Sequence, residues 1–370
     1  MNVLSLFDGI SCGMVALERA GIKIDNYFSS EVDKPAISIS ESNYPNIIRL
    51  GDVTKINTKN LPKVDLLIGG SPCQSFSFAG KMKGMSTKED IEVTTLKQYL
   101  KLKKEGFEFN GQSYLFWEYV RILKEIKPKY FLLENVKMLE KWQNIISETL
   151  GVEPVLINSS LVSAQNRKRL YWTNIAEIEK PEDKNIFLRD VINESLNKET
   201  TKIPLNINGS EKKKSNTIRV NGRGSGFYDK HNWDTIYIKT IPHGYIPEDV
   251  REKEKYPTLC AQSPASKHLV RGAAKRNQVT KRGIEAQLNI RKDNKSNCVV
   301  SSFSEKLNGV VLGEEFRPLT PEECELLQTL PFGYTSKALK TQRYKMIGNG
   351  WTVDVIRHIF DYLPEEYKVR

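Results

Sequence analysis

Two patterns of apolar and polar positions alternate along the first 175 residues. Short apolar runs of strand length are separated by longer stretches with helical periodicity, a pattern typical of a mostly parallel, doubly wound α/β sheet. Many cofactor-binding folds share it, so it predicts the fold class and not the activity. We expect strands at residues 3–7, 27–30, 47–49, 64–69, 130–134, 155–158 and 170–173, and helices at 14–20, 35–43 and 114–126.

Two regions interrupt this alternation. Residues 74–111 form a glycine- and lysine-containing stretch that is too long for an ordinary connection, which indicates a functional lid or a disordered loop. From residue 178 to about 316 the chain turns polar and basic, with only short β-like runs at 218–220, 235–238 and 298–301. Amphipathic helices return at 321–330 and 352–362. We therefore predict a cofactor-binding domain over 1–177, a second, smaller, irregular β-rich domain over 178–316, and a segment over 317–370 that returns to the first domain.

The charge of the chain is concentrated in the second of these regions. Residues 198–300 carry 21 Lys and Arg against 10 Asp and Glu, an excess that equals the formal net charge of +11 for all 370 residues. Such a local surplus favours a polyanionic partner, although a lysine-rich solvated surface would explain it as well.

Several classes of protein are disfavoured by what the sequence lacks. No run of about 18 apolar residues predicts a membrane span, and the N-terminus resembles a first strand rather than a signal peptide. Five scattered cysteines without CxxC pairs, with four dispersed histidines, favour neither a disulfide framework nor a metal site. A reducing, cytoplasmic location is expected.

Residues suited to a nucleotide follow three successive predicted strands. The turn from Phe7 through Gly9 leads into a helix, whose N-terminus favours an anionic or polar ligand. Glu31 ends the second strand, at the distance where an acidic residue commonly holds ribose hydroxyls, and Asp52 follows the third. A tight turn and two solvated carboxylates would explain each feature alone. Together they favour an adenosine-type cofactor without separating a nicotinamide from S-adenosylmethionine.

Reactive side chains follow the next strands. Cys73 comes after Gly69-Gly70-Ser71-Pro72, which places its thiol beyond a strand's carboxyl end, where open α/β sheets bind ligands. Glu134 ends a later strand and is a candidate proton donor. If the chain there is extended, the side chains of Arg167 and Arg169 lie on one face of it, where both could bind a phosphate or a carbonyl group. A buried thiol and a solvated basic turn are the alternatives for residues of these types taken singly.

The ordered motifs Phe-x-Gly, Pro-Cys-Gln, Glu-Asn-Val and Gln-x-Arg-x-Arg closely resemble those of the C5-cytosine DNA methyltransferases. Residues 317–333 resemble the penultimate motif of that family and residues 344–353 its last, so the resemblance covers about 2–175 and 317–362. The chain departs from the family pattern where Ser11-Cys12-Gly13 replaces the usual glycine pair and where Gly350-Trp351 replaces the commoner Ala-Val or Ser-Val. Both variants resemble the eukaryotic de novo branch, whereas the Pro-Cys-Gln motif resembles bacterial and phage members.

The resemblance implies an S-adenosylmethionine-dependent enzyme that methylates C5 of cytosine in duplex DNA. Cys73 would attack C6 of a base flipped out of the duplex, Glu134 would protonate N3, and Arg167 and Arg169 would hold the base carbonyl, flanking phosphates and the catalytic loop. Residues 75–91 would close over the DNA as a lid. The cofactor residues would be Phe7, Gly9, Ser11, Cys12, Gly13, Glu31, Val32, Asp52, Val53, Pro72, Asn349 and Trp351.

The basic region falls where the family carries its variable target-recognition domain. By resemblance, its DNA contacts would include Gln74, Ser75, Arg223, Thr258, Leu259 and Gln262. A monomer acting on duplex DNA is expected, with a cognate restriction endonuclease as a candidate partner and phage self-protection as the other open role. Three alternatives stay open from the residues themselves: a nicotinamide-dependent dehydrogenase, a catalytically silent DNA-binding module, and a tRNA cytosine methyltransferase of the same fold.

Overall fold

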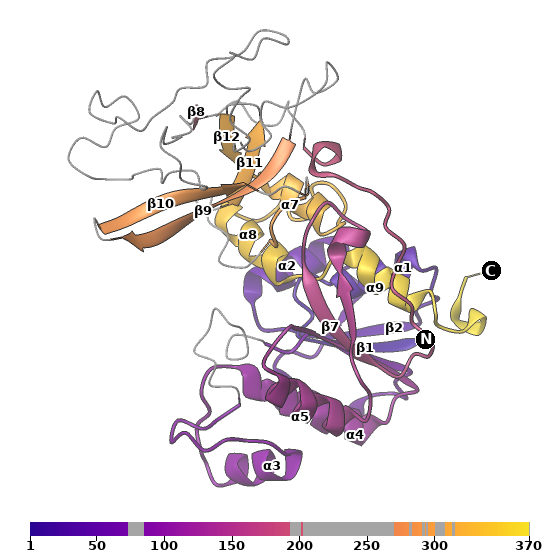
Figure 1. Cartoon of the computed structure of the whole chain (residues 1–370). Coiled ribbons are helices and arrows are strands. Elements are labelled where there is room, and N and C mark those ends of the chain that lie inside the picture. Colours follow the sequence, from indigo (N-terminus) through magenta and orange to yellow (C-terminus); the bar gives the residue numbers. More distant parts are fainter. Residues whose placement is uncertain are drawn as a thin grey trace, which may run out of the picture.

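The described residues contain a seven-stranded sheet in the order β3-β2-β1-β4-β5-β7-β6. Figure 1 labels β1, β2 and β7 of this sheet. The computed structural model describes residues 1–72, 85–192, 201–202, 270–280, 283–290, 293, 295–299, 308–312 and 315–369. The strands of the sheet are β1 (Asn2–Leu6), β2 (Asn26–Ser30), β3 (Ile48–Arg49), β4 (Leu66–Gly69), β5 (Tyr130–Val136), β6 (Val155–Asn158) and β7 (Lys168–Thr173).

Strands β1 to β5 run parallel, and β7 runs antiparallel between β5 and β6. The chain moves outward from β1 to β3 and then returns to β4 on the other side of β1, so the strand order reverses between β1 and β4. Open α/β sheets bind ligands at the carboxyl ends of the strands beside such a reversal. The predicted mostly parallel, doubly wound class is therefore confirmed, with β7 as its antiparallel exception.

Helices cover both faces of this sheet. On one face lie α1 (Cys12–Arg19), α2 (Lys34–Asn43) and α9 (Val353–Phe360), which bury Val15, Leu17 and Ile356 among other apolar side chains. On the other face lie α4 (Phe116–Ile126) and α5 (Glu140–Leu150), whose apolar sides contribute Trp117 and Ile146 to a second core. Because α9 packs against α1, the end of the chain completes the layer that the beginning starts.

The segment after β4 differs from its expected form. The expectation of a long loop over 74–111 is wrong for residues 96–104, which form the helix α3 (Leu96–Lys104). Tyr99 and Leu102 of α3 are buried in the second core, and Tyr99 Oη donates a 2.5 Å hydrogen bond to Glu118 of α4. Lys103 and Arg121 also pair with Glu118. This buried carboxylate therefore anchors α3 to the sheet domain, and residues 75–84 of the expected lid lie outside the described residues.

A second sheet, of five strands, lies in the basic region, in the order β10-β9-β11-β12-β8. A third apolar cluster, which includes Val310, packs Val299 against Leu327 and Ile347 of the helices α7 (Pro321–Leu327) and α8 (Lys340–Asn349). The sheet's strands are β8 (Thr201–Lys202), β9 (Val270–Thr280), β10 (Gly283–Ile290), β11 (Asn308–Leu312) and β12 (Glu315–Pro318).

This sheet agrees with the predicted β-rich character of the region, although not with the strands expected in it. The runs at 218–220 and 235–238 lie outside the described residues, and residues 298–299 belong to no strand. The boundaries proposed for the three domains stay a prediction. Among the described residues, no helix combines the length and the apolar character that crossing a bilayer requires.

Candidate active site

The turn after β1 is held in an unusual backbone conformation by one buried carboxylate. The backbone φ angles of Phe7, Gly9 and Ser11 are positive, at 57°, 58° and 61°. Residues other than glycine rarely adopt this region. Asp8 accepts hydrogen bonds from Ser11 Oγ (2.6 Å), Tyr27 Oη (2.7 Å) and Ser29 Oγ (2.8 Å). These bonds explain how a serine adopts this backbone conformation at position 11, because its side-chain hydrogen bond offsets part of the strain.

Glu31 connects this turn with the end of β2. Its carboxylate accepts three backbone hydrogen bonds, from Gly9 (2.8 Å), Val32 (2.7 Å) and Asp33 (2.8 Å). No described atom lies within 4 Å of the position that a Cβ on Gly9 would occupy, and the Val32 side chain is 65% exposed. A fixed carboxylate beside open space and an exposed apolar side chain is what a ribose and its base require.

Asp52 lies three residues after β3 and is fixed in a similar way. Its Oδ1 accepts from Thr54 N (2.9 Å) and Thr54 Oγ1 (2.8 Å), which caps the short helix Val53–Lys55. Ser30 Oγ donates to Gly51 O at 2.7 Å and so ties the ends of β2 and β3 together. The Val53 side chain is buried in the second core, so that a contact of Val53 with a cofactor would use its backbone.

The segment that leads to Cys73 is held by the residue after Glu134. Asn135 Nδ2 lies 3.3 Å from Ser71 O and 3.1 Å from Ser71 Oγ, and all these atoms are buried. The carboxyl ends of β4 and β5 are thus fixed against each other directly before Pro72. Asn135 was not among the expected site residues, although its place in the Glu-Asn-Val motif was a usable signal. Cys73 and the expected DNA contacts Gln74 and Ser75 lie outside the described residues.

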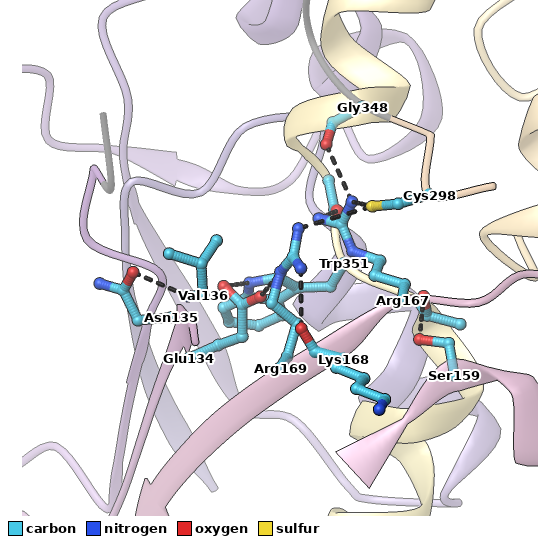
Figure 2. Close-up of polar contacts among 12 residues, drawn as sticks. Glu134, Asn135, Val136, Ser159, Arg167, Lys168, Arg169, Cys298, Gly348 and Trp351 are labelled. Atoms are coloured by element: carbon cyan, nitrogen blue, oxygen red, sulfur yellow. Dashed lines mark hydrogen bonds and ion pairs between the residues drawn. The ribbon is translucent and has the colours of Figure 1, made fainter. Parts of the chain in front are cut away.

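Glu134 is held between two side chains from other parts of the chain (Figure 2). Arg169 Nε lies 2.9 Å from its Oε1, and Trp351 Nε1 lies 3.2 Å from its Oε2. Glu134 is 8% exposed, so a charge-assisted bond is stronger there than it would be in water. The structure thus brings together three residues that were predicted from three separate motifs.

Trp351 also links this carboxylate to the segments that follow β1 and β4. A Cβ on Gly70 would lie 2.8 Å from Trp351 Nε1 and 3.1 Å from Glu134 Oε2, so only glycine leaves room for the indole there. The Cζ3 atom of the ring is 3.5 Å from the Cβ position of Gly13 at the start of α1. The indole therefore lies at the junction of the segments that follow β1, β4 and β5.

Arg167 has partners that differ from those expected. The residue is 4% exposed, and its guanidinium donates to Val299 O (2.8 Å), Gly348 O (3.3 Å) and Gly350 O (3.0 Å) (Figure 2). These carbonyls belong to the segment before β11 and to the end of α8. Arg167 therefore fixes the backbone on either side of Asn349, next to Trp351, whereas Arg169 is the arginine that reaches Glu134. The Asn349 side chain itself is exposed.

Two cysteines of the site have opposite acid–base character. Burial raises the pKa of Cys12 to about 12, despite a hydrogen bond from the Trp351 backbone. Cys298 is also desolvated, but the charges and hydrogen bonds of Arg167 and Arg169 outweigh that effect and lower its pKa. Its Sγ lies 3.3 Å from Arg167 Nη1 and 3.8 Å from Arg169 Nη2. Cys12 is therefore a protonated core thiol at neutral pH, not a nucleophile.

Four of the expected DNA contacts lie outside the described residues: Arg223, Thr258, Leu259 and Gln262. In the described ranges, no group of three His, Cys, Asp or Glu side chains is arranged to hold a metal ion.

Comparison with known proteins identifies the family. The model of the C-5 cytosine-specific DNA methylase family matches residues 1–365, so the chain belongs to that family. It is 37% identical over 190 residues to the orphan methyltransferase M.SPRI of Bacillus phage SPR, covering 48% of this chain and 38% of that protein. It is 27% identical over 401 aligned positions to the type II methyltransferase M.FnuDI of Fusobacterium nucleatum, covering 100% and 97%. The chain spans less than half the length of several other curated relatives that it matches.

Solved structures agree with the fold. A putative DNA modification methyltransferase encoded within an Escherichia coli prophage superposes with a TM-score of 0.53 at 21% identity, covering 98% of each chain. The Entamoeba histolytica methyltransferase EhMeth superposes with a TM-score of 0.55 at 15% identity, covering 100% of this chain and 99% of that one. At these identities the likeness shows a shared fold alone.

Proposed function

We propose that this chain is a DNA cytosine-5 methyltransferase that uses S-adenosylmethionine and forms a covalent adduct between Cys73 and the target base. The observation that carries the proposal is the position of Glu134. It lies at the carboxyl end of β5, is held by Arg169 and Trp351, and adjoins the Asn135–Ser71 contact that precedes Cys73. Family membership supports the same reaction.

The cofactor half of the site fits S-adenosylmethionine. The Glu31 carboxylate, fixed by three backbone N–H groups, is positioned to accept the ribose hydroxyls in the open space beside Gly9. Asp52 would receive the adenine amino group, and Val32 would cover the base. When bound, S-adenosylmethionine supplies an electrophilic methyl group on a sulfonium. The fixed carboxylates select its adenosine part by hydrogen bonding rather than by net charge.

The base half supplies the chemistry on cytosine. The Cys73 thiolate would form a bond to C6 while the Glu134 carboxyl delivers a proton to N3, so that the ring electrons move to C5. C5 then takes the methyl group, and S-adenosylhomocysteine is the leaving product. Loss of the C5 proton to a base, departure of the Cys73 thiolate from C6 and return of the N3 proton to Glu134 would restore the aromatic ring. Arg169 is the arginine that we assign to the base carbonyl and to Glu134, whereas Arg167 positions the backbone.

The target base is out of reach of a thiol while it is stacked in a duplex, so the reaction requires base flipping. The basic excess of residues 198–300 supports duplex DNA as the partner. Relatives named as orphan phage and type II methyltransferases support a role in phage self-protection or restriction-modification. A cognate endonuclease, a monomeric state and a cytoplasmic location are further parts of this proposal.

Duplex DNA that contains 5-fluorocytosine tests the covalent step. Fluorine at C5 cannot leave as a proton does, so the adduct between Cys73 and C6 is expected to persist as a shifted band on a denaturing gel. Cys73→Ala should give no band, whereas Cys324→Ala should trap normally, because Cys324 is buried in α7 with its pKa raised by burial. Adduct formation by Cys73→Ala would exclude Cys73 as the nucleophile.

The same preparation distinguishes the substrates. With tritiated S-adenosylmethionine, label is expected in duplex DNA and not in tRNA. Label in tRNA alone would assign the chain to the tRNA-modifying alternative, and label in neither would overturn the proposed reaction.

A further inference from the structure

Trp351 makes two kinds of contact, and one of them is not needed by a side chain that only packs against a cofactor. Its ring lies beside Gly13 and Gly70, the two glycines that flank the switch point of the sheet. Its Nε1 is directed at the active-site carboxylate and donates to Glu134 Oε2 at 3.2 Å (Figure 2). The residue lies in the three-residue connection between α8 and α9, so both helices fix the backbone from which the indole extends.

The carboxylate of Glu134 has two oxygens, and each has a donor of different origin. Oε1 is bound by Arg169, which lies on β7, the strand paired with β5, so that strand pairing places this donor. Oε2 is bound by a residue 217 positions further along the chain. With the Arg169 contact alone, the carboxylate plane could still turn about the bond that Oε1 makes. The indole N–H removes that freedom.

We infer that Trp351 is a positioning residue for Glu134, which orients its carboxyl group toward the ring nitrogen of the flipped base. The inference rests on the proposed function, because it concerns the proton that Glu134 delivers. Proton transfer in a transition state requires heavy atoms within hydrogen-bond reach and in line, so a carboxylate free to rotate transfers its proton more slowly.

Positioning and cofactor packing predict different kinetic effects. If Trp351 only covers the cofactor, losing its N–H should leave both affinity and rate unchanged, because the ring itself remains. If its N–H orients Glu134, the loss should lower the rate of methyl transfer at saturating cofactor while the cofactor Kd stays the same. Trp351→Phe makes this distinction, because phenylalanine keeps an aromatic ring between Gly13 and Gly70 and has no donor.

We expect Trp351→Phe to slow single-turnover methyl transfer about tenfold, the typical effect of losing a hydrogen bond to a charged group. The Kd for S-adenosylmethionine, measured by calorimetry, should change less than about twofold, which also reports correct folding. Trp172→Phe is the matched control. Trp172 Nε1 donates to Ser147 Oγ at 3.0 Å in the core behind β7, so its loss removes a buried indole bond without contact to Glu134. Its rate should equal that of the wild type.

The Glu134→Ala background shows whether Trp351 acts through the carboxylate. There the indole has no carboxylate to hold, so adding Trp351→Phe should slow the residual reaction less than about twofold. An equal tenfold loss in both backgrounds, or an unchanged rate for Trp351→Phe alone, would overturn the inference. Failure of the proposed function would look different, because the wild type would then transfer no methyl group to DNA.

Discussion

Glu31 is half-buried directly after β2, and Glu134 is buried near the carboxyl end of β5. Different kinds of contact hold the two carboxylates. Glu31 is fixed by the backbone N–H groups of its two following neighbours and of Gly9 on the adjacent strand end. Glu134 is fixed by the side chains of Arg169 and Trp351. The proposed cofactor half is thus held by local backbone N–H groups, and the proposed base half by side chains from distant segments. The base half is therefore the more sensitive to changes elsewhere in the chain.

The largest effect is expected at Arg167, which joins the base half to the last motif. Arg167→Lys keeps the charge but brings one ammonium group to a place where a planar guanidinium binds several acceptors. Buried carbonyls of Val299, Gly348 and Gly350 would lose donors, so we expect the free energy of unfolding to fall by about 2–4 kcal/mol. Urea denaturation measures this.

Arg189→Lys is the matched control for that change. Arg189 is exposed, and its nearest acidic partner is Asp190, so its replacement should alter the free energy of unfolding by less than about 0.5 kcal/mol. Equal denaturation midpoints for both variants would show that the Arg167 contacts do not hold the base half together.

The next largest effect is expected at Glu31, in the proposed cofactor half. In Glu31→Gln an amide –NH2 group replaces one of the two carboxylate oxygens. That group cannot accept a hydrogen bond, so the side chain can no longer bind the N–H groups of Gly9, Val32 and Asp33 together. We expect the Kd for S-adenosylmethionine to rise about tenfold, with the methyl-transfer rate at saturation nearly unchanged. Glu41→Gln, an exposed change on the neighbouring helix α2, should leave the Kd at its wild-type value. A lowered saturated rate for Glu31→Gln would mean that the two halves are not separable.

The smallest effect concerns the two cysteines of opposite character. The folded-state pKa of Cys12 is about 12, above its ordinary value of 9.0, so the unfolded chain loses this proton first. The stability linked to Cys12 is therefore complete below pH 9 and is lost as the pH rises toward 12. Cys12→Ala should reduce the loss of stability between pH 7 and pH 10 by about 1.4 kcal/mol.

Cys298 gives the opposite sign and serves as the comparison. Because its folded-state pKa is lowered, its ionisation adds stability as the pH rises toward 9, and Cys298→Ala should make the alkaline loss steeper. Urea midpoints measured at pH 7 and pH 10 check both variants. A steeper loss for Cys12→Ala would contradict the assignment of Cys12 as a protonated core thiol.

The parts of the molecule that sequence could predict are those with a local signal. Strand ends and the residues after them, such as Gly9, Glu31 and Asp52, follow apolar runs that show their positions directly. The motifs predicted Arg169 and Trp351 as site residues but not their contacts with Glu134. No sequence periodicity shows that Trp351 reaches Glu134 or that Arg167 donates to the carbonyl of Gly348. The helix α3 was hidden in the same way, since its lysine-rich face gives a polar average although Tyr99 and Leu102 are buried. Long-range burial decides these cases.

The contacts of Arg167 also set the order in which the site can form during synthesis. Its carbonyl partners Val299 and Gly350 are 132 and 183 residues further along the chain. At about 5–20 residues per second, the ribosome reaches the second of them roughly 10–40 s after it adds the arginine. During that interval a nascent chain contains the three residues whose N–H groups bind Glu31. It lacks Gly350, which binds Arg167, and Trp351, which binds Glu134. The contacts that hold Arg167 and Glu134 can therefore be complete only after residue 351 has been added.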